Sequence, residues 1–310
     1  IEGEEEIASE HLDRFLAANR ELLRADVAIV SDSAWFARGV PSICYGLRGI
    51  TYLQVNVKGP DSDLHSGSFG GAVANPAQVL CEIIAALKDA HGRVDVPGFY
   101  DRVRPLSPEE RRQFASLPFD EEEYRRGLGV PALFGEEGYT TIERVWARPT
   151  LEVNGIWGGF TGEGSKTVLP ARASAKISCR LVPDQEPEEI TALVESRLRE
   201  LCPPTVEMEI VRLHSGKPAI TPLDHPATRA AARAMERAFQ KRPVFIRSGG
   251  SVPVVASMQE MLGLPVVLMG VGLPDEHSHA PNERLDLGNF FGGIRAAAFL
   301  WEELAGMQTP

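Results

Sequence analysis

The chain has 310 residues, of which 43% are hydrophobic and 24% are charged. This composition is typical of a folded globular protein, it excludes a disordered chain or a fibre, and the length favours two domains. The formal net charge is −11, which argues against a nucleic-acid partner because an acidic chain repels the phosphate backbone. No apolar run approaches the roughly 18 residues of a membrane-spanning helix.

Residue spacing predicts α/β structure at both ends of the chain and a different pattern between them. Near the N-terminus, apolar residues at helical spacing predict a helix over residues 10–24, and two short apolar segments predict buried strands of a sheet. From residue 50 the segment 50–59 alternates apolar and polar side chains, as a half-exposed strand does. The elements expected in chain order are a helix at 10–24, strands at 27–32, 42–46 and 50–59, a helix at 75–90, a strand at 172–182, a helix at 187–201, a strand at 205–213, a helix at 225–240, a strand at 242–246, a helix at 251–262, a strand at 264–270 and a helix at 287–306.

This order predicts an α/β domain that is built from residues 1–49 and 214–310. A second domain, residues 50–213, is inserted between them as a two-layer α+β unit with a split β-α-β, ferredoxin-like plan. The polar stretch 98–148 is expected to be a surface excursion within that insert.

The four cysteines have wide spacing and apolar neighbours, which predicts reduced, buried thiols and a cytoplasmic location. The chain begins at Ile1 within an acidic run and shows no initiation, signal or transit signature. We therefore expect that its natural N-terminus is missing.

Two acidic motifs near the start could serve a metal site. In EGEEEIAS (2–9), Glu5 and Glu6 precede a helix, so they are either acids favoured by the helix dipole or a metal ligand beside a proton acceptor. Asp32, in VSDSAW, follows a predicted strand, where it could be a turn or cap residue or an oxygen ligand for a divalent ion.

Three further polar motifs could carry chemistry. DEHSHAPNE (275–283) places two histidines and two acids directly after a buried strand, where α/β sheets bind ligands. In DLHSGSFGG (63–71), the glycines beside His65 allow close approach of a ligand, although an exposed turn histidine explains the motif equally well. RSGGSVP (247–253) contains Gly250 and Ser251 and could present backbone N–H groups to an anion, but a plain turn is the simpler interpretation.

Together and in this order, the motifs resemble the co-catalytic metallopeptidases that include carnosinase, cytosolic non-specific dipeptidase, glutamate carboxypeptidase and acetylornithine deacetylase. The matching stretches are EGEEEIAS, VSDSAW, YGLRG, DLHSGSFGG, GSKTVLPARASAKISCRLVP, GGSVPV and HSHAPNE. The last four are most similar to the dipeptidase branch. The resemblance implies a catalytic domain with two divalent metal ions, most readily Zn²⁺ with Mn²⁺ or Co²⁺ as alternatives, and an inserted lid domain that forms a homodimer.

The resemblance also implies a role for each metal-site residue. Glu5 is similar to the general base that acts on the metal-bridging water, and Glu6, Asp32 and His279 are similar to metal ligands. His65 resembles the lid histidine that reaches into the site of the partner subunit and stabilises the oxyanion.

For the substrate, the resemblance implies contacts from the insert and from the Gly-rich turn. Arg180 is similar to the clamp for a free carboxylate, and Thr167, Gly250 and Ser251 are similar to substrate-contacting positions. The expected activity is therefore hydrolysis of dipeptides or short peptides that end in a free carboxylate.

The family carries a further histidine ligand and a bridging aspartate upstream of the paired glutamates, and neither motif is present here. We therefore expect a fragment that is inactive alone. Two alternatives remain open, namely an N-acyl-amino acid deacylase or carbamoylase of the same family and a catalytically incomplete module that only dimerises. G-x-G-x-x-G and G-x-x-x-x-G-K are both absent, which argues against nucleotide binding.

Overall fold

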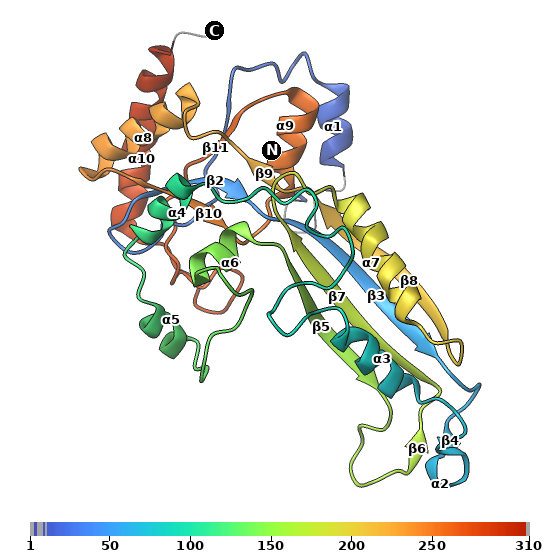
Figure 1. The fold of residues 1–310 in the computed structure, drawn as a ribbon. Helices are drawn as coiled ribbons and strands as arrows, with labels where there is room; N and C mark the ends of the chain where they lie inside the picture. Colours follow the sequence, from blue (N-terminus) through green and yellow to red (C-terminus); the bar gives the residue numbers. More distant parts are fainter. Residues whose placement is uncertain (1–2, 5–8, 10, 308–310) are drawn as a thin grey trace. The chain divides into compact units, whose positions relative to one another are not determined.

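The computed structural model describes residues 3–4, 9 and 11–307. The chain separates into two compact units (Figure 1). Unit 1 comprises Ile1–Leu47, Leu106–Pro118 and Pro218–Pro310, and unit 2 comprises Arg48–Pro105 and Phe119–Lys217.

Unit 1 contains a mixed sheet whose main strand order is β1-β11-β2-β10, with β9 paired to β2. β1 runs parallel to β11 and β2 runs parallel to β10, whereas β11 and β2 are antiparallel. The strands are β1 (Ala28–Val30), β2 (Ser42–Leu47), β9 (Ala219–Ile220), β10 (Val244–Ser248) and β11 (Val266–Leu268). The apolar strands β2 and β11 are buried along their whole length, as the sequence predicts, but β1 is only half-buried.

Helices α8 and α10 pack together beside this sheet. The buried face of α8 is rich in alanine, which lets the two helices approach closely, and Gly292 of α10 lies against the ring of Phe239 with no room for a Cβ. The helices of unit 1 are α1 (Leu12–Ala18), α4 (Pro108–Ala115), α8 (Pro226–Phe239), α9 (Pro253–Leu262) and α10 (Leu287–Ala305).

Unit 2 is built on an antiparallel sheet of order β5-β7-β3-β8 with two helices packed into one core cluster against it. Leu53, Val55 and Val57 of β3 are almost fully buried in that cluster, while the alternate residues are half-exposed. The elements are β3 (Gly49–Lys58), α3 (Pro76–Ala85), β5 (Thr150–Gly158), β7 (Arg172–Leu181), α7 (Pro187–Leu201) and β8 (Glu207–Gly216). The order of these elements along the chain and the order of the strands in the sheet confirm the predicted ferredoxin-like fold of this unit.

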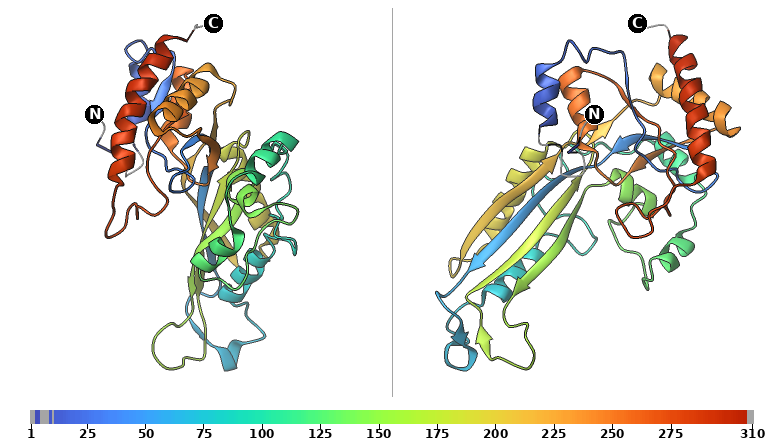
Figure 2. Two further views of the ribbon diagram at one scale, coloured as in Figure 1. Left: turned by 90° about the vertical axis from the view of Figure 1, so that its left-hand side faces the viewer. Right: turned by 180° about the vertical axis from the view of Figure 1, so that it is seen from behind.

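A small two-stranded sheet lies at one end of unit 2, beyond the long strands (Figure 2). It pairs β4 (Leu64–His65) with β6 (Val168–Leu169), and α2 (Ser66–Phe69) follows β4 directly. Two more short helices, α5 (Glu121–Gly127) and α6 (Thr141–Ala147), complete the unit.

Several details differ from the sequence predictions. The strand β5 is not predicted, because its alternation is interrupted by a register shift between Val153 and Gly155. Residues 106–118 belong to unit 1, and α4 there buries Phe114, so this part of the chain is not a surface excursion of the insert. The first helix ends at Ala18 rather than near residue 24, and Cys81 is exposed rather than buried.

All four cysteines have free thiols. Burial raises the pKa of Cys44 to about 11 and that of Cys179 to about 12. Among the residues that the structure describes, no helix combines the length and apolar character needed to cross a membrane.

Candidate functional site

The segments that contain Asp32 and His279 leave the same edge of the sheet in unit 1. Their strands, β1 and β11, are parallel neighbours, so both carboxyl ends open at that edge. The two loops begin side by side, because the Gly270 N–H donates to Ser33 Oγ at 2.9 Å and the Trp35 N–H donates to the Gly272 carbonyl at 2.8 Å. Asp32 and His279 are both exposed.

The loop 275–286 after β11 has an unusual backbone. His277, His279 and Asn282 have φ angles of 57°, 60° and 65°, in the left-handed region that non-glycine residues rarely adopt. The His277 carbonyl accepts a hydrogen bond from the Ala280 N–H at 2.9 Å. Such clustered strain persists only where the surroundings hold it, and it is common at functional sites.

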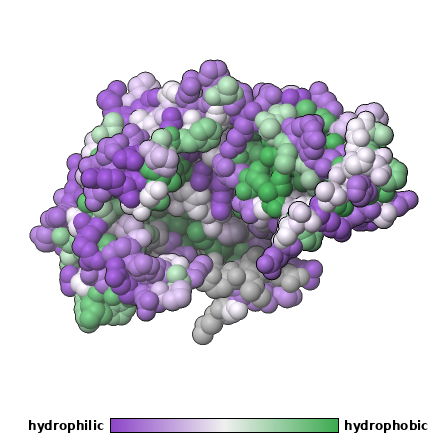
Figure 3. All heavy atoms as spheres, turned by 90° about the horizontal axis from the view of Figure 1, so that it is seen from below, coloured by the Kyte–Doolittle hydropathy of each residue, from purple (hydrophilic) through white to green (hydrophobic). Residues whose placement is uncertain are grey.

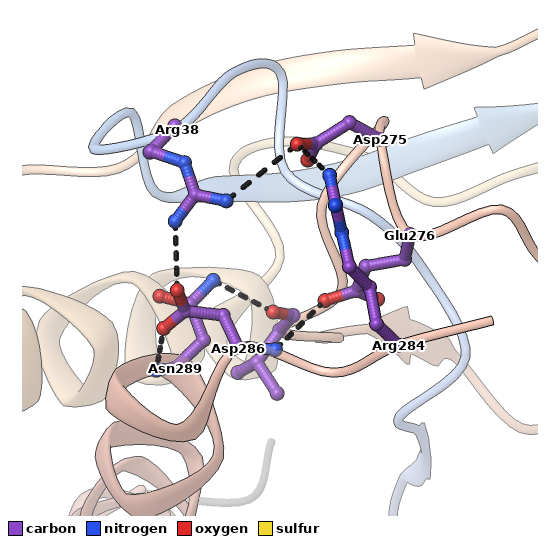
Figure 4. A network of polar contacts seen from close by, with 7 residues as sticks. Arg38, Asp275, Glu276, Arg284, Asp286 and Asn289 are labelled. Atoms are coloured by element: carbon purple, nitrogen blue, oxygen red, sulfur yellow. Dashed lines mark hydrogen bonds and ion pairs between the residues drawn. The ribbon is translucent and has the colours of Figure 1, made fainter. Parts of the chain in front are cut away.

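Charged side chains hold the two ends of this loop together (Figure 4). Arg284 donates to Asp275 at 2.6 Å, and Arg38, from the loop after β1, donates to Asp286 at 2.7 Å. Asp286 also caps α10 by accepting the Asn289 N–H at 2.9 Å. That backbone hydrogen bond and Arg38 hold the pKa of Asp286 below its ordinary value.

A cavity of about 360 Å³ lies inside this ring of charges. Its lining residues are Arg38, Leu273, Glu276, Arg284, Leu285, Asp286 and Leu287. Sequence reasoning missed Arg38 and Arg284 because a charged residue in a loop has no spacing signature.

The predicted base Glu5 and the predicted ligand Glu6 lie outside the described residues. Within the described part of the chain, no group of three or more histidine, cysteine, aspartate or glutamate side chains is placed to hold a metal ion. Asp32 and His279 are carboxylate and imidazole donors suited to Zn²⁺, but the described residues alone do not complete a metal site.

Gly250 and Ser251 follow β10 in a turn that Ser248 stabilises, since its Oγ accepts the Gly250 N–H at 3.1 Å. β10 is parallel to β2, and β2 is antiparallel to β11. The carboxyl end of β10 therefore lies at the opposite edge of the sheet from those of β1 and β11. The strand directions alone do not bring this turn beside Asp32.

A buried charge cluster precedes that turn. Arg247 pairs with Glu110 of α4, and its Nε donates to Tyr45 Oη at 3.2 Å. Tyr45 Oη in turn donates to Glu110 at 2.5 Å. Nearby, Gln113 Nε2 donates to the Phe245 carbonyl of β10 at 2.8 Å, so α4 contributes polar side chains to β2 and β10.

In unit 2, the structure brings together two predicted site residues that are far apart in sequence. His65 pairs with Val168 across the β4–β6 sheet, and the Ser66 N–H donates to the Thr167 carbonyl at 3.0 Å. His65 Nδ1 accepts the Gly67 N–H at 3.1 Å, so the proton of a neutral ring is on Nε2. His65 is exposed and can offer that N–H as a donor.

Arg180 lies near the other end of the same unit, on β7 opposite Ile50 and Thr150. It is half-buried, and burial lowers its pKa. The neighbouring Arg48 has its pKa lowered to about 10 by burial and by the charge of Arg180, while Glu152 opposes the shift. Partly desolvated guanidinium groups suit charge-assisted hydrogen bonds to a carboxylate, and Arg48 is a residue that sequence reasoning missed.

His65 and Arg180 do not share one site within a single chain. The β4–β6 sheet lies at the end of β7 where Arg172 stands, since the Ala171 N–H donates to Asp63 at 2.9 Å. From there to Arg180 the extended strand rises by about 26 Å at 3.3 Å per residue. One dipeptide does not span that length.

Comparison with known proteins gives consistent matches. The family model described as a peptidase dimerisation domain matches residues 45–206. The Cys-Gly metallodipeptidase dug1 of Schizosaccharomyces pombe is 34% identical over 312 residues, covering 99% of this chain and 66% of that one. The Beta-Ala-His dipeptidase of Homo sapiens is 33% identical over 310 residues, covering 98% of this chain and 61% of that one.

A solved structure agrees with these matches. The M20 family metallo-carboxypeptidase Sso-CP2 from Sulfolobus solfataricus has a TM-score of 0.87 at 32% identity, covering 96% of this chain and 68% of that one. This chain covers 66% of the dipeptidase from Schizosaccharomyces pombe and 61% of the one from Homo sapiens, so it spans slightly less than two thirds of their length. Because the family model matches more than half of the chain, and Sso-CP2 is 32% identical over 68% of its own length, the chain belongs to the M20 peptidase family and carries that family's dimerisation domain.

Proposed function

We propose that this chain is part of a dinuclear metal-dependent dipeptidase that hydrolyses the amide bond of dipeptides or short peptides with a free C-terminal carboxylate. The observation that supports this most strongly is the 34% identity to a Cys-Gly metallodipeptidase over 99% of the chain. The same chemistry fits the human Beta-Ala-His dipeptidase that the chain also resembles.

In the proposed catalytic centre, Asp32, His279 and Glu6 supply ligands and Glu5 accepts the proton of the attacking water. Bound divalent metal ions, with Zn²⁺ as the first choice and Mn²⁺ or Co²⁺ as alternatives, would lower the pKa of that water and polarise the scissile carbonyl. The common edge of β1 and β11 supports the pairing of Asp32 with His279.

We assign the substrate carboxylate to Arg180, with Arg48 beside it. Both guanidinium groups are partly desolvated, and the charge of Arg180 lowers the pKa of Arg48, so a substrate carboxylate would gain charge-assisted hydrogen bonds there. Gly250 and Ser251 are proposed as further substrate contacts, and Thr167, which lies beside His65, is proposed to contact the substrate in the site of a partner copy.

The separation of His65 from Arg180 along β7 supports a homodimer in which each copy completes the site of the other. His65 of one copy would donate its Nε2–H to the developing oxyanion in the site of its partner. The dimerisation-domain match over residues 45–206, which includes His65 and Arg180, is consistent with this exchange.

The test is an assay of the complete protein, loaded with Zn²⁺, Mn²⁺ or Co²⁺ in turn, on Cys-Gly and β-Ala-His beside N-acyl and N-carbamoyl amino acids. Metal-dependent hydrolysis of the dipeptides is expected, and Glu5→Gln should lower kcat by at least about 100-fold. Preference for acyl or carbamoyl substrates would instead identify a deacylase or carbamoylase. Absence of any metal-dependent hydrolysis would leave only the dimerisation module.

Mixing two inactive variants tests the exchanged histidine. His65→Ala and Arg180→Met, each inactive as a homodimer, should regain up to about a quarter of wild-type activity when mixed, because half of the chains enter mixed dimers and each mixed dimer holds one intact site. Failure to regain activity in a verified mixed dimer would contradict the assignment.

A further inference from the structure

The imidazole of His65 is held by the turn that follows it in the chain. Hydrophilic and hydrophobic residues are intermixed on the molecular surface (Figure 3), so exposure alone does not distinguish this histidine. Its contact with the backbone does. His65 lies in an extended conformation directly before α2, and its Nδ1 accepts a hydrogen bond from the Gly67 N–H at 3.1 Å. The exposed ring therefore has a defined partner within its own turn.

Gly67 lies so close to this ring that a side chain does not fit there. A Cβ atom on Gly67 would lie 3.0 Å from Cε1 and 3.2 Å from Nδ1 of His65, whereas carbon atoms in contact are about 3.5–4.0 Å apart. Gly67 is not one of the glycines with a positive φ angle, so its backbone conformation is open to other residues. The space that the imidazole occupies is therefore what calls for glycine at this position.

The backbone that carries His65 is fixed by the segment around β6. The Ser66 N–H donates to the Thr167 carbonyl at 3.0 Å, and the Ala171 N–H donates to the Asp63 carboxylate at 2.9 Å. These two hydrogen bonds hold the chain on either side of His65. The freedom that remains to the ring is rotation about its side-chain torsions, of which the outer one is broad for histidine. The hydrogen bond to Nδ1 selects one orientation from that range.

The same contact decides which ring nitrogen can donate. A neutral imidazole carries one proton, so a nitrogen that accepts a hydrogen bond leaves the proton on the other nitrogen. Nδ1 is the acceptor here, and the exposed ring of His65 offers its Nε2–H. A donor that is already protonated and oriented stabilises a developing oxyanion without reorganisation at the moment of reaction. A ring free to rotate would lose part of that stabilisation.

We propose that Gly67 is a positioning residue, whose N–H and missing side chain hold the His65 imidazole in one orientation with its proton on Nε2. The ring is then ready to donate to the anionic oxygen that forms when water adds to the scissile carbonyl. The use of this donor rests on the proposed dipeptidase function, whereas the holding of the ring is independent of any activity.

Nuclear magnetic resonance of the complete protein with 15N-labelled histidine tests the holding of the ring. The His65 signals are those that disappear in His65→Gln, and their couplings show which nitrogen is protonated in the neutral ring. The wild-type ring should carry its proton on Nε2. Gly67→Ala should raise the share of the Nδ1-protonated form at least about twofold, because the methyl group displaces the ring from its hydrogen-bond donor. Ser68→Ala, at the next and also exposed position of α2, is the matched control and should leave the signals unchanged.

Steady-state kinetics on Cys-Gly tests the use of the donor. Gly67→Ala should lower kcat at least about tenfold and leave KM within about twofold, because the oxyanion exists only in the transition state. Ser68→Ala should match the wild type in both constants. Alanine is the best helix former, so the fold of α2 should tolerate it.

Three results would overturn the proposal. They are His65 signals that Gly67→Ala does not alter, a kcat that it does not lower, and a rise in KM at unchanged kcat. If the wild-type protein hydrolyses no dipeptide, the proposed function fails instead, and the resonance measurement alone decides whether Gly67 holds the ring.

Discussion

The substitution Glu110→Ala removes the acceptor from the buried charge cluster of unit 1. In the native chain, the side chains of Arg247 and Glu110 are only 8% and 17% exposed, and Tyr45 donates to the same carboxylate. Without Glu110, the Arg247 charge stays buried without its counter-ion and Tyr45 loses its acceptor. Breaking a buried pair from one side costs about 3–5 kcal/mol, which lowers the ratio of folded to unfolded unit by roughly 10²–10⁴-fold.

Urea unfolding followed by circular dichroism measures this loss. With a slope of about 1–3 kcal/mol per molar urea, the midpoint should fall by about 1 M or more. Glu109→Ala on the same helix is the control, and it should change stability by less than about 0.5 kcal/mol because Glu109 is exposed. A midpoint for Glu110→Ala equal to that of the control would refute the reasoning. Partial recovery in the double variant Glu110→Leu, Arg247→Met would support it, since an apolar pair of similar size replaces a buried ion pair at little cost and only Tyr45 still lacks its acceptor.

Three further outcomes are expected. Arg38→Met should speed hydrogen exchange in the loop 275–286 by at least about tenfold, because Arg38 ties that loop through Asp286; an unchanged rate would show that the ion pair does not order the loop. Ile177→Ala should destabilise unit 2 by about 2–5 kcal/mol in urea unfolding, whereas Ile156→Ala, at a half-exposed position of β5, should have a much smaller effect. Above pH 9 and up to about pH 11, the free energy of unfolding of unit 1 should fall as pH rises, because the pKa of Cys44 is raised to about 11 in the fold and the unfolded thiol ionises first; a Cys44→Ala variant with the same slope would rule this out.

Helices and strands were predictable from the sequence where their apolar residues follow a single period, either helical or alternating. The helix over residues 187–201 is predicted with its observed bounds, because Pro and acids begin it and its apolar spacing is uninterrupted. The bounds of strand β3 are predicted to within one residue at each end, because its apolar and polar residues alternate without interruption. β5 is different, because its exposed edge and its register shift near Gly155 remove the alternation.

The residues of the candidate site could be predicted from the sequence, but their arrangement in space could not. The loops with Asp32 and His279 each follow an apolar strand, as predicted, whereas the parallel pairing of those two strands is visible only in the fold. The charges that hold the His279 loop, and Glu110 in a polar stretch taken for surface, depend on partners far away in sequence. A long-range ion pair leaves no local pattern, so only the fold reveals it.

The discontinuous make-up of unit 1 has a consequence during translation. Tyr45 and Arg247, which meet in the fold, are separated by 202 positions in the chain. A ribosome that adds about 5–20 residues per second needs about 10–40 s to cover that distance. Throughout this interval, the apolar strand that starts at Ser42 lacks its parallel neighbour β10, whereas unit 2, which ends at Lys217, can complete its sheet before β10 is made. Nascent chains should therefore depend on chaperones that hold the exposed strand β2 until β10 is made.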